Sequence, residues 1–187
     1  MTSNQKLWGK AVLSTYNYLQ RLCDSLDKLV EKTAVNSHYY NSLHSAENSI
    51  ESISNKIIEY SNRKIDYINL KIIIEKALKD IPKQYAKLLI LKYIQKMPIE
   101  KASQLLNISR RSSYRQLEQA LASFMVMLTQ YGYTIEKLEL DYSSDPFIKS
   151  VLRLIKQNNF LIEEKAEVIT NESVFAKYIN DLLASAV

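Results

Sequence analysis

Glycine, proline and cysteine are all scarce in this chain of 187 residues, and each scarcity narrows the class of fold. Two glycines and three prolines are too few for a protein of strands and tight turns, which depends on glycine at positive φ and on proline at fixed φ. The single cysteine, Cys23, cannot form an internal disulfide. The class that remains is a mostly helical chain.

Several function-bearing patterns are missing as well. No run of 18 or more apolar residues is present, so no membrane span is expected. The polar start, Met1 to Lys6, does not resemble a signal peptide, and we therefore expect a cytoplasmic protein. A glycine-rich phosphate loop, a Cys/His metal set and a nucleophile elbow are all absent from the sequence. We therefore predict no catalytic residues, no cofactor and no bound metal.

The charge of the chain is modest in total but uneven in its placement. The net charge is +5, yet residues 60–131 hold 13 basic and 5 acidic side chains, a surplus of eight. The flanks hold the remaining 12 basic and 15 acidic side chains. Basic charge gathered on one segment is typical of a nucleic-acid binder, although solvated helices also carry such a surplus.

The first 78 residues predict a helical hairpin. Residues 5–32 carry apolar side chains at the alternating spacing of four and three that is typical of a coiled-coil seam. The seam consists of Trp8, Val12, Thr15, Leu19, Leu22, Leu26 and Leu29. It favours packing on the chain's own second helix, and dimerisation through the N-terminal helix is the alternative.

A polar stretch from Thr33 to Ser45 predicts the loop of the hairpin. Helical spacing then resumes over residues 46–79, with a break expected near Ser61 and Asn62. The inward stripe of this second helix is predicted as Ile50, Ile53, Ile57, Ile65, Ile68, Ile72 and Leu78. The following segment, residues 83–96, is apolar on more than one side, so it must be covered twice. We expect it between the next helices and either the hairpin or a partner protein.

Residues 79–130 predict a helix-turn-helix. Pro98 begins a short helix over residues 99–106, and Asn107 stands where a turn requires the left-handed region. Ser109 is a good N-cap for the next helix. On that helix, Leu117 and Phe124 share one face with Ser113, Ala120 and Leu121. At about 100° per residue, a second face lies roughly 120° away and carries Arg111, Tyr114, Arg115 and Glu118.

This layout suits a recognition helix. Its apolar face can pack on the preceding helix, and the side chains near its start can reach base edges in the major groove. Arginine fits the task because its planar guanidinium can pair with guanine O6 and N7 or with a phosphate.

Four stretches within this part of the chain carry a family resemblance. They are Ala77–Pro82, Leu88–Tyr93, Glu100–Ser109 and Ala120–Leu121. The pattern resembles the fourth conserved region of bacterial sigma factors, and it is most similar to sigma-like helix-turn-helix proteins of phages and prophages. The resemblance implies packed helices, binding of double-stranded DNA near promoters and, for true sigma factors, contact with RNA polymerase. By the match, Arg110, Arg111, Ser112, Tyr114 and Arg115 take the DNA-facing positions, and we add Ser109 to this set.

The sequence also departs from the family pattern. Asn107 replaces the usual turn glycine, Ser103 replaces alanine, and Ser113 replaces valine or isoleucine. A buried Ser113 hydroxyl must therefore find a backbone carbonyl. No counterpart of the region with which sigma factors melt the −10 element is recognisable, which argues against a complete sigma factor.

We thus predict an all-α fold in three parts and two alternative functions. Residues 1–78 form the helical hairpin, 79–130 the DNA-binding helix-turn-helix, and 131–187 a C-terminal helical extension of unknown role. Within the extension, Ser144–Pro146 predicts the start of a helix that runs to about Gln157. The leading function is a sequence-specific DNA-binding transcription regulator of sigma-like type. The alternative is a helical interaction module that binds RNA polymerase or a sigma factor without specific DNA readout.

Overall fold

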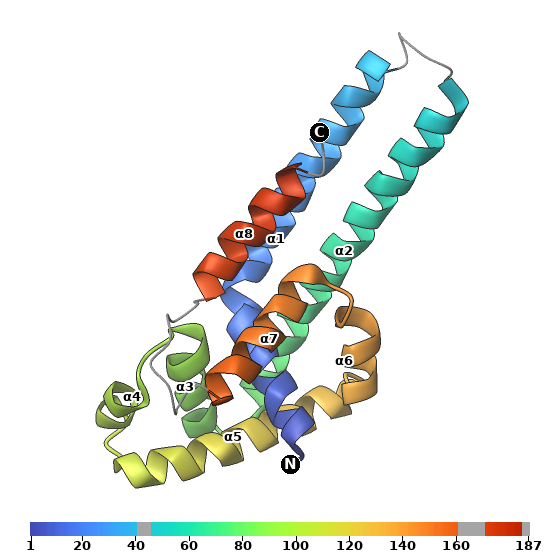
Figure 1. Ribbon diagram of the computed structural model, residues 1–187. Coiled ribbons are helices and arrows are strands. Elements are labelled where there is room, and N and C mark those ends of the chain that lie inside the picture. The colour runs from blue at the N-terminus through green and yellow to red at the C-terminus, as the bar shows by residue number, and fades with distance from the viewer. Residues whose placement is uncertain (41–45, 161–170, 185–187) are drawn as a thin grey trace.

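The computed structural model describes residues 1–40, 46–160 and 171–184. All the regular secondary structure of these residues is helical, which confirms the all-α class (Figure 1). The elements are α1 (Ser3–Tyr40), α2 (Ala46–Asp80), α3 (Lys83–Leu89), the π-helical turn η1 (Ile90–Ile94), α4 (Ile99–Leu105), α5 (Arg110–Gln130), α6 (Ile135–Tyr142), α7 (Pro146–Phe160) and α8 (Asn171–Ala184).

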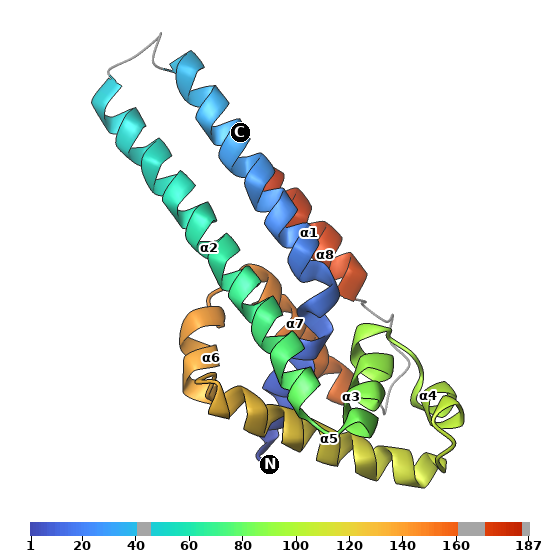
Figure 2. The same ribbon diagram turned by 180° about the vertical axis from the view of Figure 1, so that it is seen from behind.

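The two longest helices, α1 and α2, lie side by side and form the predicted hairpin (Figures 1 and 2). The seven seam residues of α1 are all buried, with exposed fractions of 3% or less. Thr15, the one polar member, satisfies its hydroxyl by donating to the Val12 carbonyl at 2.8 Å. The seam therefore packs inside the molecule, against α2, α5 and α7 among others, and leaves no apolar row on α1 for a dimer.

The prediction of a loop over Thr33–Ser45 is wrong for its first part. Helix α1 continues to Tyr40, and residues 41–45 lie outside the described residues. No glycine or proline occurs between residues 33 and 40, so nothing in this polar stretch forces the helix to end. For the same reason α2 passes Ser61 and Asn62 without the expected break.

The predicted inward stripe of α2 is also wrong in its second half. Ile65, Ile68 and Ile72 are 53%, 39% and 56% exposed. The buried row lies on the opposite side of the helix and consists of Tyr60, Tyr67, Leu70, Ile73, Ile74, Ala77 and Leu78. The row with the tyrosines is buried because Tyr67 finds a hydrogen-bond acceptor inside the protein, the Asp145 carboxylate, at 2.6 Å.

The apolar segment after α2 is covered on two sides, as its composition requires. Helix α3 packs on α5 and α2, with Leu88 and Leu89 fully buried. The expected single helix of residues 83–96 instead changes at Ile90 into η1, whose side chains contact α1 and α4. The covering elements belong to this chain, and no partner protein is needed to bury Leu88 and Leu89.

The C-terminal helices pack on the hairpin. Asp145 caps α7 by accepting from the Ile148 backbone N–H at 2.9 Å, as the Ser144–Pro146 sequence predicts. Phe147 of α7 and Phe175 of α8 lie in contact with Tyr18 of α1, with ring centroids 5.5 and 5.1 Å from the tyrosine ring. A further helix expected between Phe160 and Ile169 falls almost wholly outside the described residues. Buried side chains from all three parts of the chain form one continuous core.

Candidate nucleic-acid interface

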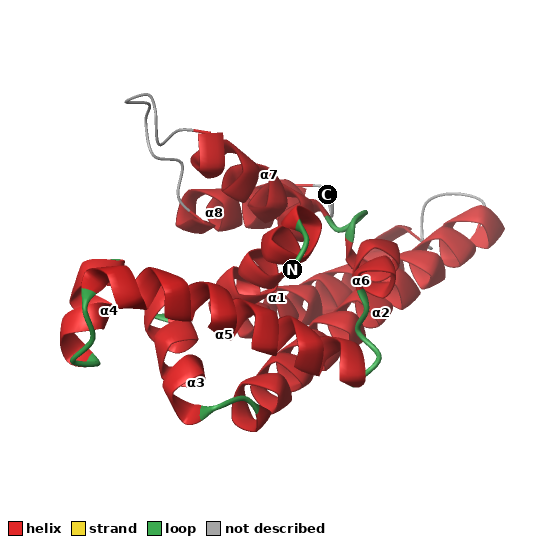
Figure 3. Cartoon of the chain, turned by 90° about the horizontal axis from the view of Figure 1, so that it is seen from below, coloured by secondary structure: helices red, strands yellow, loops and turns green. Residues whose placement is uncertain are grey.

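The helix-turn-helix is formed by α4, a short turn and α5, at the end of the molecule opposite to the hairpin tip (Figures 1 and 3). Asn107 in the turn has φ +53°, the left-handed conformation that the sequence predicts for this position. Ser109 caps α5, since its hydroxyl accepts from the Ser112 backbone N–H at 3.2 Å. The turn between the two helices is therefore fixed by local chemistry.

One face of α5 is buried, and its members are those that the spacing predicts. They are Ser113, Leu117, Ala120, Leu121 and Phe124, with exposed fractions of 9% or less. The Ser113 hydroxyl donates to the Arg110 carbonyl at 2.7 Å, which supplies the partner that its burial requires. Ser103 of α4 is satisfied in the same way by the Glu100 carbonyl at 2.7 Å. Both serine departures from the family pattern are thus compatible with a packed helix-turn-helix.

The other face of α5 is open at its start. Arg111 and Arg115 are exposed, and Tyr114 between them is 48% exposed. Ser112 is half-buried, and its hydroxyl accepts from the Gln116 amide at 3.2 Å. Arginine side chains on the first two turns of an exposed helix face have the position and chemistry needed to contact a nucleic acid.

Arg110 differs from the other two arginines because it has partners in the protein. Its guanidinium lies 2.9 Å from the Glu100 carboxylate of α4. A side-chain hydrogen bond with Tyr114 and the charge of Glu100 raise the pKa of Arg110. The side chain therefore stays charged, and it lies across the mouth of the turn between α4 and α5.

The start of α1 packs on the same face of α5, further along the helix, and sequence reasoning missed this contact. A stripe with the spacing 4, 3, 4, 3 and 4 begins with Arg111 and Arg115 and continues through Glu118, Ala122, Met125 and Thr129. Gly9 of α1 lies so close that a Cβ built there meets the Met125 sulfur at 3.1 Å. The Lys6 ammonium of α1 lies 2.6 Å from Glu118, and this hydrogen bond lowers the pKa of the Glu118 carboxyl. No signal along the sequence links residues 112 positions apart.

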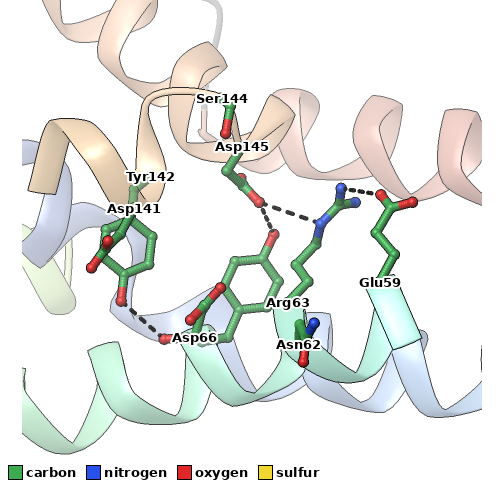
Figure 4. Close-up of a pocket in the computed structure, with 9 residues that line it drawn as sticks. Glu59, Asn62, Arg63, Asp66, Asp141, Tyr142, Ser144 and Asp145 are labelled. Atoms are coloured by element: carbon green, nitrogen blue, oxygen red, sulfur yellow. Dashed lines mark hydrogen bonds and ion pairs between the residues drawn. The ribbon is translucent and has the colours of Figure 1, made fainter. Parts of the chain in front are cut away.

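A polar pocket lies away from the helix-turn-helix, between α2 and the turn that joins α6 to α7 (Figure 4). It has a volume of about 220 Å³, and its charged groups are paired with one another. Arg63 bonds Glu59 at 2.9 Å and lies 4.0 Å from Asp145, which also accepts from Tyr67 at 2.6 Å. This cluster joins the hairpin to the C-terminal helices and accounts for its own polar groups.

Two further features bear on the class of function. Among the described residues, no group of three or more His, Cys, Asp and Glu side chains is placed to hold a metal ion. No helix in the described part of the chain has the length and apolar content of a membrane span. The notable surface is the arginine-bearing start of α5.

Fold and surface together define a helix-turn-helix protein whose second helix presents arginines. Comparison with known families gives the type: residues 71–124 match the sigma-70 region 4 family. This segment runs from the end of α2 to the middle of α5 and contains the entire turn. The helix-turn-helix is therefore of the sigma region 4 type, a DNA-binding domain of the transcription apparatus. Neither a curated protein nor a solved structure matched the chain.

Proposed function

We propose that the chain binds double-stranded DNA sequence-specifically near promoters and regulates transcription in the manner of a sigma factor. The observation that supports this proposal is the exposed face of Arg111, Tyr114 and Arg115 at the start of α5, within a helix-turn-helix of the region 4 type. Such an action takes place in the cytoplasm of a bacterial cell, and the family match suggests RNA polymerase as a further partner.

The proposed contacts follow from side-chain chemistry. Arg111 and Arg115 can each pair in a bidentate manner with guanine O6 and N7 in the major groove. Ser109, Ser112 and Tyr114 carry hydroxyl groups suited to phosphate oxygens, and Arg110 lies where α4 and α5 meet the backbone. Base pairs would then be read by two arginines, and the remaining groups would set the position of the helix.

The test replaces Arg111 or Arg115 by alanine in the full chain. We expect specific binding to a selected duplex to be lost, because each good bidentate contact discriminates by about 1–3 kcal/mol. The melting temperature and the circular dichroism spectrum should hardly change, since both side chains are exposed. Arg153→Ala on α7, another exposed arginine, is the control.

Two outcomes would contradict the proposal: unchanged binding by the α5 variants, or loss of the fold. Mapping of bound sites across a genome is the complementary experiment. Sites centred near the −35 promoter element would support the sigma-like action that we propose.

A second candidate function is a protein-interaction module, and one observation favours it. The exposed face of α2 carries Ile58, Ile65, Ile68 and Ile72 at a spacing of 7, 3 and 4, which is the repeat of a coiled-coil seam. A chain that fails to bind random duplex at low salt but co-purifies with RNA polymerase or a sigma factor would support this function instead.

A further inference from the structure

Three lysines from outside the α4–α5 unit lie at the edge of the recognition face. Lys6 and Lys10 are four residues apart, so they lie on one side of the first turns of α1. Lys6 reaches Glu118 of α5 at 2.6 Å, which fixes this side of α1 against α5. Lys92 belongs to η1, which packs on α1. We call Lys6, Lys10 and Lys92 the lysine edge.

The three ammonium groups are close enough to influence one another. Burial lowers the pKa of Lys10, the positive charges of Lys6 and Lys92 lower it further, and Glu118 acts in the opposite direction. A fold gains no stability from crowding three like charges beside one carboxylate. Such a group is understandable where an anionic partner completes it.

The position of the lysine edge relative to the arginines suggests what that partner is. Glu118 lies seven residues after Arg111 on the same stripe of α5, a rise of about 10 Å along the helix axis. The major groove is about 8.5 Å deep. When the first turn of α5 reaches the base edges, the level of Glu118 and Lys6 is therefore the level of the phosphates at the groove rim.

The contact between Lys6 and Glu118 also removes an obstacle. Glu118 has a side chain that is 66% exposed on the DNA-facing stripe, where an unpaired carboxylate would repel phosphates. Pairing with Lys6 cancels this charge, and Lys10 and Lys92 leave the edge positive. On the far side of the lysine edge, the start of α1 covers α5, so the arginine face ends there.

We infer that Lys6, Lys10 and Lys92 bind the phosphates that flank the major groove entered by α5, and that the N-terminal helix thereby forms part of the DNA-binding surface. This inference rests on the proposed function and adds residues to it. Phosphate contacts carry no sequence information, so these lysines contribute affinity and orientation, while Arg111 and Arg115 contribute readout.

The experiment compares the full chain with a variant that carries Lys6→Gln, Lys10→Gln and Lys92→Gln. Binding to a target duplex and to a random duplex is measured by fluorescence anisotropy over a series of salt concentrations. We expect affinity for both duplexes to fall by about tenfold or more at 0.1 M salt. The slope of log Kobs against log salt should decrease in magnitude by about 0.9 for each lost phosphate contact.

Two matched variants separate this effect from net charge and from folding. Lys28→Gln, Lys56→Gln and Lys149→Gln remove the same charge from exposed positions elsewhere and should leave the slope nearly unchanged. Arginine at the three positions of the lysine edge keeps the charge and should keep the affinity. Equal weakening by both glutamine sets, or an unchanged slope for the lysine-edge set, would overturn the inference.

The outcomes also separate this inference from the proposed function. Wild-type binding with an unchanged slope in the lysine-edge variant contradicts only the role of these lysines. Absence of wild-type binding to any duplex contradicts both.

Discussion

Single side chains at the turn show how the helix-turn-helix tolerates unusual residues. Asn107 has positive φ, Ser109 accepts a backbone hydrogen bond, and Ser113 donates to a carbonyl three residues earlier. All three roles could be predicted from the sequence because each depends on neighbours within one turn. The pairing of Lys6 with Glu118 could not be predicted, because it depends on how two distant helices meet.

Asn107 gives a prediction at this scale. Replacement by alanine should lower the free energy of unfolding by about 1 kcal/mol, because a Cβ without a compensating polar group is strained at φ +53°. Glycine should be neutral or stabilising, since it adopts this conformation without strain. Urea unfolding of the two variants provides the measurement. Asn69→Ala, at an exposed position within α2, should cause no loss, and equal stability of all the variants would contradict the prediction.

At the scale of elements, the spacing of apolar residues predicted the helices better than it predicted their faces. The α1 seam and the α5 faces were assigned correctly because each helix carries a single apolar row. Helix α2 carries two rows, one of isoleucines and one with tyrosines, and periodicity alone does not say which is buried. The choice is made by hydrogen bonds from Tyr67 to Asp145 and from Tyr142 to the Asp66 carbonyl. These partners lie far apart in the sequence.

The contact between α1 and α5 gives the prediction for this scale. Valine at position 9 should destabilise the protein by about 1–3 kcal/mol, because a Cβ already meets Met125 at 3.1 Å and further methyl groups overpack the contact. Alanine should be close to neutral, since its gain in helix propensity offsets a small shift of the methionine. Urea unfolding measures both. Lys28→Val at an exposed position of α1 is the control, and a valine-9 variant as stable as wild type would contradict the close packing.

At the scale of the whole molecule, one core joins the hairpin, the helix-turn-helix and the C-terminal helices. Several of the 13 tyrosines are buried in or against this core. Burial raises the pKa of Tyr67, Tyr93 and Tyr142, with the charge of Asp145 adding to the effect at Tyr67. Which residues meet in such a core is set by the arrangement of all the helices, which local patterns do not contain.

These tyrosines predict how stability depends on pH. Their pKa in the folded state lies above the unfolded value of about 10, so the folded chain holds the protons more tightly. Their contribution to stability is therefore complete below about pH 10 and is lost as the pH rises towards the folded values. A spectrophotometric titration of phenolate should show the native protein lagging behind the chain in urea. Tyr67→Phe should shorten the lag, and coincident titration curves would contradict the prediction.

The length of the hairpin has a consequence for how the molecule can be used. With 38 residues, α1 is about 57 Å long, and the helix-turn-helix lies at one end of it. A duplex held by α5 would therefore stand far from the tip formed by the end of α1 and the start of α2. Anything that grips the tip would leave the duplex unobstructed, and the stiff pair of helices would act as a spacer of fixed length between the two.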